Sequence, residues 1–181
     1  FSALGDRILA VKELDTVLMR DVGDVLLASQ KALLLLDPSC QCSVFLRHRD
    51  CNYLNVTKFS DMQKEPVRLA LLGALRYGKF LVFDLLDCAM LHVVEDICDE
   101  VQQGLWRKVL DDFHTIRSEK FYASILRESD DEAYSLLYVT PERLARFHLI
   151  VLTSQPLVIP LSLRSSFYTL YIMLENMSIG C

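Results

Sequence analysis

Glycine and proline are scarce in this chain, with 6 glycines and 5 prolines among 181 residues, and no low-complexity tract occurs. Apolar residues make up 52% of the sequence. This composition argues against a disordered segment and favours a globular domain. At this length the chain can fill one hydrophobic core, or at most two small ones. Since no linker is visible, we expect one domain.

Long apolar runs are also absent. The longest unbroken run, Ala32 to Leu36, is far too short to cross a bilayer. The N-terminus lacks the basic flank, apolar stretch and small-residue cleavage site of a secretory signal. We therefore expect a cytoplasmic protein that does not bind membranes. Because the chain begins with Phe1 rather than Met, we also expect it to belong to something larger.

Basic residues are outnumbered, with 19 Lys and Arg against 24 Asp and Glu and a pI near 5.3. The nearest approach to a basic stripe is Arg47-His48-Arg49, which Asp50 follows at once. Nucleic-acid binders usually carry a clustered basic surface, whereas a solvated charged turn explains these residues equally well. We expect no nucleic-acid partner.

Cysteine is the one uncommon residue that is plentiful, with 6 in the chain. Without a secretory signal, reduced thiols are a better explanation than a disulfide framework. The spacing Cys40-x-Cys42-x5-His48-x2-Cys51 offers four zinc ligands but fits no common ribbon or finger, and a helix there would keep them apart. We expect no bound metal, and a zinc-stabilised adaptor remains an alternative.

Apolar runs and amphipathic stretches alternate along the chain. In residues 1–30 apolar side chains recur at spacings of three and four residues, which predicts a helical N-terminal segment before a domain over 31–181. Short apolar runs predict buried strands, at 31–36, 54–59, 80–83, 147–153 and 167–174. Helices are expected from Ser60-Asp61 to Gly78 and over 90–103. Within about 119–140, two apolar runs flank a charged tip, Glu128 to Glu132, and predict a hairpin insertion.

This alternation predicts an α/β fold, a three-layer sandwich with a mainly parallel sheet. In such folds a phosphate-binding loop follows the first buried strand, with glycines that turn backbone N–H groups inward and a lysine that meets the outer phosphates. No Gly-x4-Gly-Lys-Ser/Thr motif occurs in the sequence. The loop after the first strand reads Asp37-Pro38-Ser39-Cys40-Gln41-Cys42 instead.

The residue types in this loop oppose phosphate binding. Asp37 adds negative charge, Pro38 removes a donor, and no lysine lies between Lys31 and Lys58. A carboxylate facing a polyanion costs about 4 kcal/mol for unit charges about 4 Å apart at protein-like dielectric. The loop therefore stands where a phosphate loop belongs, without its chemistry.

The third strand, FLVFD at 80–84, has the form of a Walker B strand whose carboxylate holds Mg²⁺. Leu85 follows Asp84, where an ATPase of this type keeps a glutamate to activate water. A turn or a helix cap is the plainer explanation for Asp84. Thr153 ends another strand, and a strand-end cap explains it.

Four segments of the chain resemble, in the same order, parts of the dynein heavy chain motor, specifically its fifth AAA+ module. These segments are LLLLDPSCQCSVFL, LNVTKFSD, ALLGALRYGKFLVFDLLD and FHLIVLTSQPLVIP. There a strand ends in Asp-Pro-Gln, and a Leu-x-Val-x-Lys strand and a helix ending in glycine follow. The resemblance covers roughly residues 30 to 175. A dynein-like module outside a motor also resembles the end portion of an IQ-motif and ankyrin-repeat protein.

The resemblance implies a P-loop-NTPase-like fold with a degenerate Walker A loop, because the dynein module does not hydrolyse nucleotide. It also implies that the loop from Asp37 to Cys42 is a vestigial nucleotide loop, that Asp84 is a vestigial Walker B aspartate, and that Thr153 is a sensor-like residue. Here Cys40 and Cys42 replace the usual Gly and Ala, a further departure from a nucleotide site. By resemblance alone, it also implies a cytoskeletal, ciliary or calmodulin-linked context.

The sequence thus predicts a non-catalytic pseudo-ATPase module, with no catalytic residues and no cofactor, that acts as a structural or protein-interaction domain. Its partner is expected to be another protein or neighbouring domains of a larger chain. Two acidic segments are candidate contacts, Glu95 to Glu100 and Glu128 to Glu132, although solvated surface explains both. The alternative is a structural ATP- or ADP-binding module without hydrolysis, which uses the backbone of 37–42 and Asp84 for magnesium.

Overall fold

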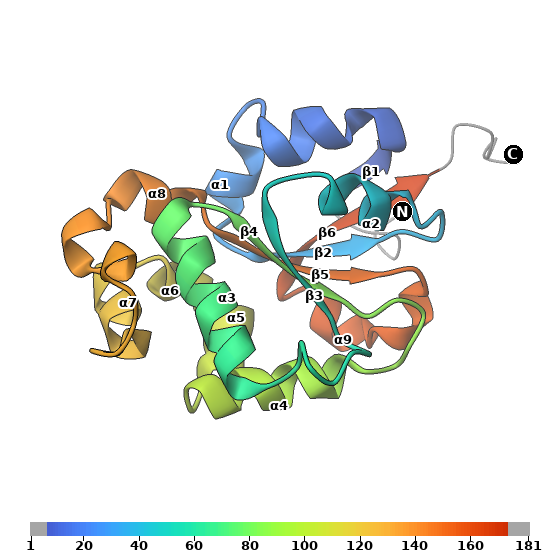
Figure 1. Cartoon of the computed structure of the whole chain (residues 1–181). Coiled ribbons are helices and arrows are strands. Elements are labelled where there is room, and N and C mark those ends of the chain that lie inside the picture. Colours follow the sequence, from blue (N-terminus) through green and yellow to red (C-terminus); the bar gives the residue numbers. More distant parts are fainter. Residues whose placement is uncertain (1–6, 174–181) are drawn as a thin grey trace, which may run out of the picture.

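The computed structural model describes residues 7–173 of the chain, and within them the fold is α/β with one six-stranded sheet (Figure 1). The order of strands is β1-β6-β2-β5-β4-β3, and every neighbouring pair is parallel. The strands are β1 (Arg7–Ala10), β2 (Ala32–Leu36), β3 (Cys51–Asn55), β4 (Phe80–Asp84), β5 (His148–Thr153) and β6 (Phe167–Met173). The expected mainly parallel sheet is thus parallel throughout.

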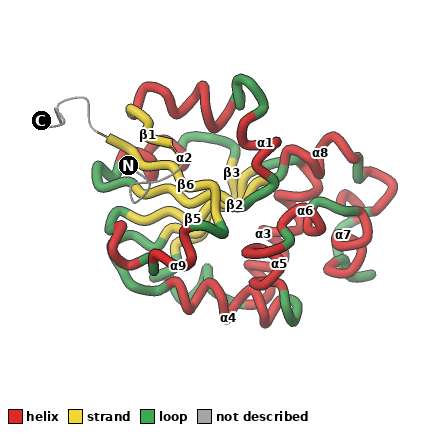
Figure 2. The backbone as a smooth tube through the Cα atoms, turned by 180° about the vertical axis from the view of Figure 1, so that it is seen from behind, coloured by secondary structure: helices red, strands yellow, loops and turns green. Residues whose placement is uncertain are grey.

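Helices connect the strands and lie on both faces of the sheet (Figures 1 and 2). The α-helices are α1 (Val25–Ser29), α2 (Gln41–Arg47), α3 (Lys64–Tyr77), α4 (Leu91–Val101), α5 (Leu105–Asp111), α6 (Phe113–Ile116), α7 (Glu119–Ile125), α8 (Pro141–Arg146) and α9 (Leu161–Arg164). Shorter turns are η1 (Val11–Glu13), η2 (Asp15–Met19, a π-helix), η3 (Glu132–Tyr134), η4 (Leu136–Tyr138) and η5 (Pro156–Val158). No helix within 7–173 is both long and apolar enough to span a membrane.

Alternation along β2 divides the interior into two cores, one on each face of the sheet. Leu34 and Leu36 pack with α3, α4 and α5, whereas Leu33 and Leu35 pack with η2, α1 and α2. All five residues of β2 are buried, because successive side chains of a central strand point to opposite, covered faces. The three-layer sandwich expected from the sequence follows from this double burial.

Helix α3 is the long helix expected before the predicted strand 80–83, which is β4 in the structure. It ends at Gly78, whose φ of 68° and ψ of 46° form a left-handed C-cap, a conformation that costs glycine little. A Cβ at this position would lie 2.8 Å from the carbonyl oxygen of Arg143. The sequence therefore located the end of this helix correctly, and the close approach of α8 gives a second reason for the glycine.

The expected hairpin over about 119–140 is wrong. Residues 119–125 form helix α7, and two 3-10 turns, η3 and η4, occupy 132–138. Ser118 caps α7 by accepting a hydrogen bond from the Phe121 N–H at 3.1 Å. Short apolar runs fit a buried helix as well as a strand, and here the N-cap decides in favour of the helix.

The N-terminal segment also differs from the expectation of a purely helical 1–30. Within its described part, residues 7–10 form the edge strand β1, parallel to β6, and short helical turns follow. Residues 1–6 and 174–181 lie outside the described part of the chain. The strand predicted at 54–59 corresponds to β3, which begins earlier, at Cys51, and ends at Asn55. It ends there because the chain turns at Thr57, whose N–H donates to the Asn55 side chain.

Candidate functional site

The carboxyl ends of β2, β4 and β5 meet at one edge of the sheet, where ligands bind in folds of this type. A small cavity of about 80 Å³ lies there, and Asp37, Cys40, Asp84 and Ser154 are among the residues that line it. The structure thus brings together loop residues and the Walker-B-like aspartate that the sequence singled out. Pockets for nucleotide-sized ligands are several times larger than this cavity.

The Asp37 side chain occupies the centre of the loop after β2 and is buried. One carboxylate oxygen accepts hydrogen bonds from the Ser39 N–H at 3.0 Å and the Ser39 hydroxyl at 2.5 Å. The other accepts from the Cys42 N–H at 2.6 Å. Backbone N–H groups that a phosphate loop would direct at a ligand are therefore bound by an anion that belongs to the chain.

Backbone geometry holds this arrangement in place. The Asp37 N–H donates to the Thr153 carbonyl at 2.8 Å, which joins the loop to the end of β5. Cys40 adopts a left-handed conformation, with φ 59° and ψ 15°, at the N-cap of α2, which is unfavourable for a non-glycine residue. The neighbouring Cys42 thiol is buried, and burial together with the Asp37 carboxylate raises its pKa far above the ordinary value.

Asp84 is buried at the end of β4 and is bound by protein groups on both oxygens. One oxygen accepts a short hydrogen bond from the Tyr53 hydroxyl and lies 3.9 Å from Nη2 of Arg47, and the other accepts from the Leu86 N–H at 2.9 Å. Burial and the hydrogen bond to Asp84 raise the pKa of Tyr53, which keeps the phenol a donor. Asp84 thus fixes the turn after β4 through Leu86 and also joins this turn to β3 and α2 through Tyr53 and Arg47.

Thr153 is fully buried at the end of β5. Its hydroxyl lies 3.1 Å from the Leu86 carbonyl oxygen and accepts from the Gln155 N–H at 3.1 Å. Leu86 itself has a left-handed φ of 55°, and its carbonyl also accepts from the Ser154 N–H at 2.8 Å. The sensor-like threonine therefore caps a strand and fixes the turn after β4.

The other loop residues lie around this centre. Pro38 lines a separate apolar groove with Leu157, Leu161 and Tyr171. Gln41 is exposed and begins α2, where its N–H donates to the Ser39 hydroxyl at 3.3 Å. Neither residue lines the small cavity, so the structure assembles part of the predicted loop around it and leaves the rest outside.

The four possible zinc ligands near α2 do not converge. Within residues 7–173 no group of three or more His, Cys, Asp or Glu side chains is placed to hold a metal ion. The five cysteines of this range are free thiols, with Cys40 exposed and Cys42 and Cys98 buried. Cys181 lies outside it.

A contact between Arg117 and the buried, neutral His148, which the sequence did not predict, lies at the opposite ends of the strands. Arg117 Nη2 is 2.7 Å from Nδ1 of His148, and its Nε donates to the Phe147 carbonyl at 2.8 Å. Because arginine only donates, Nδ1 accepts and the imidazole is neutral. Burial and the Arg117 charge lower the pKa of His148 to about 3. Residues so far apart in sequence leave no local signal for such a pair.

No family model matches the chain, and no solved structure matches it significantly. The chemistry of the site therefore has to be argued from its own groups. Its two carboxylates, Asp37 and Asp84, each accept hydrogen bonds from protein donors on both oxygens. Cys40, which lines the cavity, is exposed, whereas the Cys42 thiol is buried.

Proposed function

We propose that this chain is a non-catalytic, dynein-like AAA+ module, a pseudo-ATPase that serves as a structural or protein-interaction domain. The observation that carries the proposal is the Asp37 carboxylate, which binds the Ser39 and Cys42 N–H groups at the start of α2. A phosphate in this place would have to displace a buried carboxylate and would meet its charge. Both effects oppose nucleotide binding.

The order of strands supports the AAA+ part of the proposal. Strand β5, with the sensor-like Thr153, lies between β2, which precedes the loop, and β4, which ends in the Walker-B-like Asp84. P-loop NTPases of the AAA+ type share this arrangement. The fold alone does not define a function, so the contacts of the loop carry the argument for an inactive site.

Neighbouring AAA+ modules normally pack side by side, so the working surface of an inactive module is a face for another protein or domain. By resemblance, that partner belongs to a larger chain or to a cytoskeletal, ciliary or calmodulin-linked assembly in the cytoplasm. Of the two acidic segments suggested by the sequence, 95–100 lies within helix α4, with Glu95, Asp96, Asp99 and Glu100 exposed.

Thermal unfolding with and without saturating Mg-ATP or Mg-ADP tests the proposal. A ligand at a hundred times its dissociation constant adds about 2.7 kcal/mol, or roughly 5 to 10 °C for a chain of this size. We expect neither nucleotide to shift the melting temperature by more than the shift that Mg²⁺ alone produces.

The matched control is Asp84→Asn, which removes the one carboxylate that the alternative assigns to magnesium. A shift of several degrees in the wild type that Asp84→Asn abolishes would establish a retained nucleotide site. The chain would then be a structural ATP- or ADP-binding module, and the proposal that the loop after β2 does not bind nucleotide would be wrong.

A further inference from the structure

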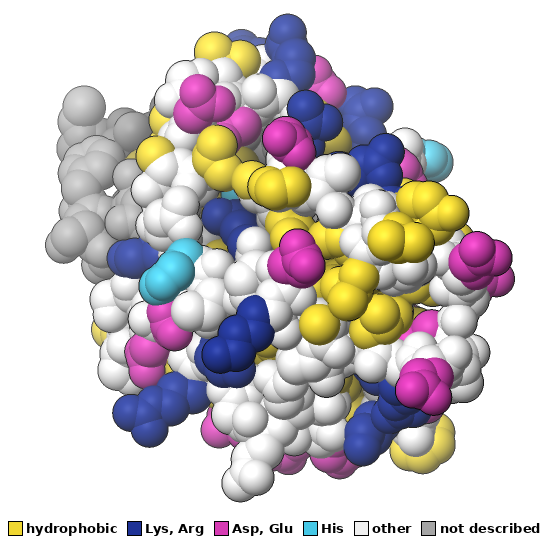
Figure 3. All heavy atoms as spheres, turned by 90° about the vertical axis from the view of Figure 1, so that its left-hand side faces the viewer, with side chains coloured by type: hydrophobic (Ala, Val, Ile, Leu, Met, Phe, Trp, Pro, Cys, Tyr) yellow, Lys and Arg dark blue, Asp and Glu magenta, His cyan; other side chains and the backbone are white. Residues whose placement is uncertain are grey.

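An apolar surface lies at the C-terminal end of α3, on the left-hand side of Figure 1 and facing the viewer in Figure 3. Leu136, Leu137 and Tyr138 form the 3-10 turn η4, and all three are exposed, Leu137 to 88%. Tyr77 of α3 is exposed beside them, since the Arg76 guanidinium lies 4.8 Å from its ring centre and 5.4 Å from that of Tyr138. We call these four residues the Leu137 surface.

In the segment 128–142, which contains η4, a charged side chain is buried and apolar side chains are exposed. Asp130 points inward, and its carboxylate forms two hydrogen bonds to the buried Arg68, at 2.7 and 2.8 Å. The leucines that follow it point outward. A buried ion pair and an exposed apolar cluster are the two informative departures from ordinary surface chemistry, and here one short segment contains both.

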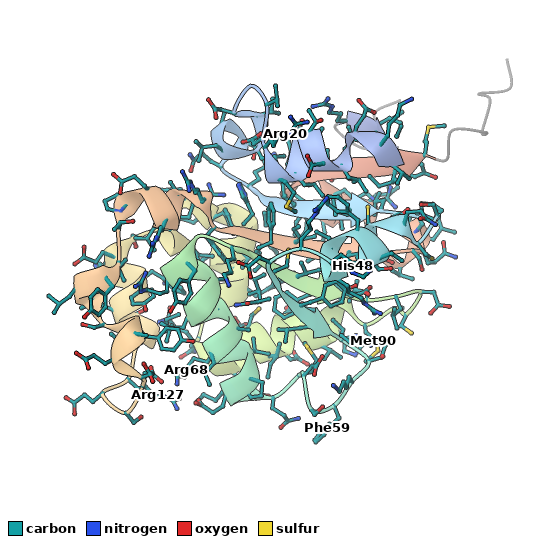
Figure 4. All side chains as sticks on the ribbon, turned by 45° about the horizontal axis from the view of Figure 1, so that its top comes forward. Arg20, His48, Phe59, Arg68, Met90 and Arg127 are labelled. Carbon is teal, nitrogen blue, oxygen red and sulfur yellow. The ribbon has the colours of Figure 1, made fainter. Side chains whose placement is uncertain are left out.

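Hydrogen bonds and packing contacts hold the segment 128–142 in place in the absence of a partner. Arg76 Nε donates to the Ala133 carbonyl at 2.8 Å, and the Tyr122 hydroxyl donates to the Tyr134 carbonyl at 2.7 Å. Tyr134 also packs near Gly73, where a Cβ would lie 3.8 Å from its ring. Figure 4 shows Arg127 close to Arg68 of α3, and Arg127 Nη1 lies 2.6 Å from Oε1 of Glu65. A surface fixed in advance loses little entropy on binding.

The charge beside the Leu137 surface has one sign within its own segment. Residues 128–142 contain five carboxylates and no lysine or arginine. Arg68 neutralises Asp130, which leaves Glu128, Asp131, Glu132 and Glu142 exposed. From the elements packed against the segment, Arg68 and Arg76 are buried and Arg127 pairs with Glu65. Lys79, whose Nζ lies 5.3 Å from the Tyr77 ring centre, pairs with Asp50 at 2.8 Å. Arg143 and Arg146 on α8 are exposed.

We infer that the Leu137 surface binds an amphipathic helix of a partner protein whose apolar stripe is flanked by lysine or arginine. The exposed leucines and tyrosines would receive the stripe, and the carboxylates of 128–142 would face the basic flank. The inference rests on the proposed function, because it names the partner chemistry of an interaction module.

Binding of a labelled synthetic helix, followed by fluorescence anisotropy at physiological salt, tests the inference. The probe is an 18-residue peptide with leucine on one stripe and lysine on the other face. One comparison peptide has the same composition in an order that breaks the stripe, and another has glutamate in place of lysine. We expect the first peptide to bind at least tenfold more tightly than either comparison peptide.

The variants locate the contact. Leu137→Ser should weaken the probe at least tenfold, and Glu132→Lys should weaken it several-fold and reduce its salt dependence. Leu157, which is 86% exposed in η5, supplies the matched control, since Leu157→Ser should change binding less than twofold. Glu95→Lys is the corresponding control for charge. Both exposed leucine variants should melt at the wild-type temperature.

Three outcomes would overturn the inference: equal binding of the stripe-broken peptide, no effect of Leu137→Ser, or equal losses from Leu137→Ser and Leu157→Ser. A fourth is a wild-type dimer in analytical ultracentrifugation that Leu137→Ser converts to a monomer, because the occupant would then be a second copy. None of these depends on nucleotide. A nucleotide-dependent melting shift would refute the inactive module separately, whatever the peptide result.

Discussion

Asp37 turns a loop that resembles a ligand site into a self-contained turn. Its carboxylate binds the Ser39 and Cys42 N–H groups, so the start of α2 has no free donors at these positions. Hydrogen bonds to a charged acceptor are about twice as strong as neutral ones. The same residue that opposes phosphate therefore also contributes to the stability of the fold.

Replacing Asp37 with alanine should destabilise the protein by about 2 to 4 kcal/mol, because the buried Cys42 N–H and the half-buried Ser39 N–H lose their acceptor. Urea unfolding monitored by circular dichroism measures the loss. Ser39→Ala is the control, since it leaves the Asp37 carboxylate and its two N–H donors in place. It removes the hydroxyl that donates to Asp37 and accepts from the Gln41 N–H, and it should cost less than half as much. Equal losses in the two variants would mean that the carboxylate adds nothing beyond the serine contact.

At this scale the sequence predicted residue positions better than contacts. It placed Asp37, Asp84 and Thr153 at strand ends, and all three lie at the same edge of the sheet. It did not predict that Tyr53 binds Asp84. A tyrosine in a strand gives no sign of its neighbour on the adjacent strand, because that contact depends on register.

Among the elements, the segment between α7 and α8 departs furthest from the sequence pattern. Its charged residues predicted an exposed tip, yet Asp130 is buried against Arg68 of α3. The Arg68 hydrogen bond lowers the pKa of Asp130 to about 2. Charge alone indicates exposure in most proteins, and the exception requires a partner that sequence spacing cannot reveal.

Replacing Arg68 with methionine should cost about 3 to 5 kcal/mol, because the buried Asp130 carboxylate would keep its charge and lose its ion-pair partner. The double variant Arg68→Met/Asp130→Leu should be more stable than Arg68→Met alone, as the uncompensated charge is gone. Both values come from urea midpoints. Arg107→Met, at an exposed arginine on α5, is the control and should change stability by less than about 0.5 kcal/mol.

If the double variant were as unstable as Arg68→Met, the loss would come from packing around the guanidinium and not from the stranded carboxylate. The tie between α3 and the segment would then be apolar in origin. The Leu137 surface could still be tested, since its own residues are exposed and are not altered in either variant.

For the whole molecule, the sequence predicted the class of fold and its layers. Continuous apolar runs such as 32–36 indicate strands buried on both faces, and these lie in the centre of the sheet. It could not predict which strands are neighbours, because burial patterns identify faces and not partners. The edge strand β1 was missed, since its four residues fit a helical repeat equally well.

The global stability should fall in acid before the carboxylates are titrated. The pKa of His148 is about 3 in the folded protein, below the ordinary 6.5, so the unfolded chain binds a proton that the folded chain does not. Stability is therefore lost as the pH falls from about 6.5 toward 3, by roughly 3 to 5 kcal/mol in total. Urea midpoints at pH 7.5, 6, 5 and 4 give the slope.

His148→Gln keeps an acceptor for Arg117 without a titrating group, so its midpoint should depend less on pH over this range. A variant whose slope equals that of the wild type would show that His148 does not control the acid limb. The expected difference corresponds to at most one proton between the two states.

The parallel order of the sheet also has a consequence for how the chain is made. Strand β2 pairs only with β5 and β6, which follow it by roughly 110 residues or more, a gap that takes on the order of ten seconds to synthesise. Throughout that interval the five consecutive apolar residues of β2 have no strand to pair with. A ribosome that pauses before β5 would thus leave the hydrogen-bonding edges of this apolar strand unpaired, and chaperones would be expected to bind it there.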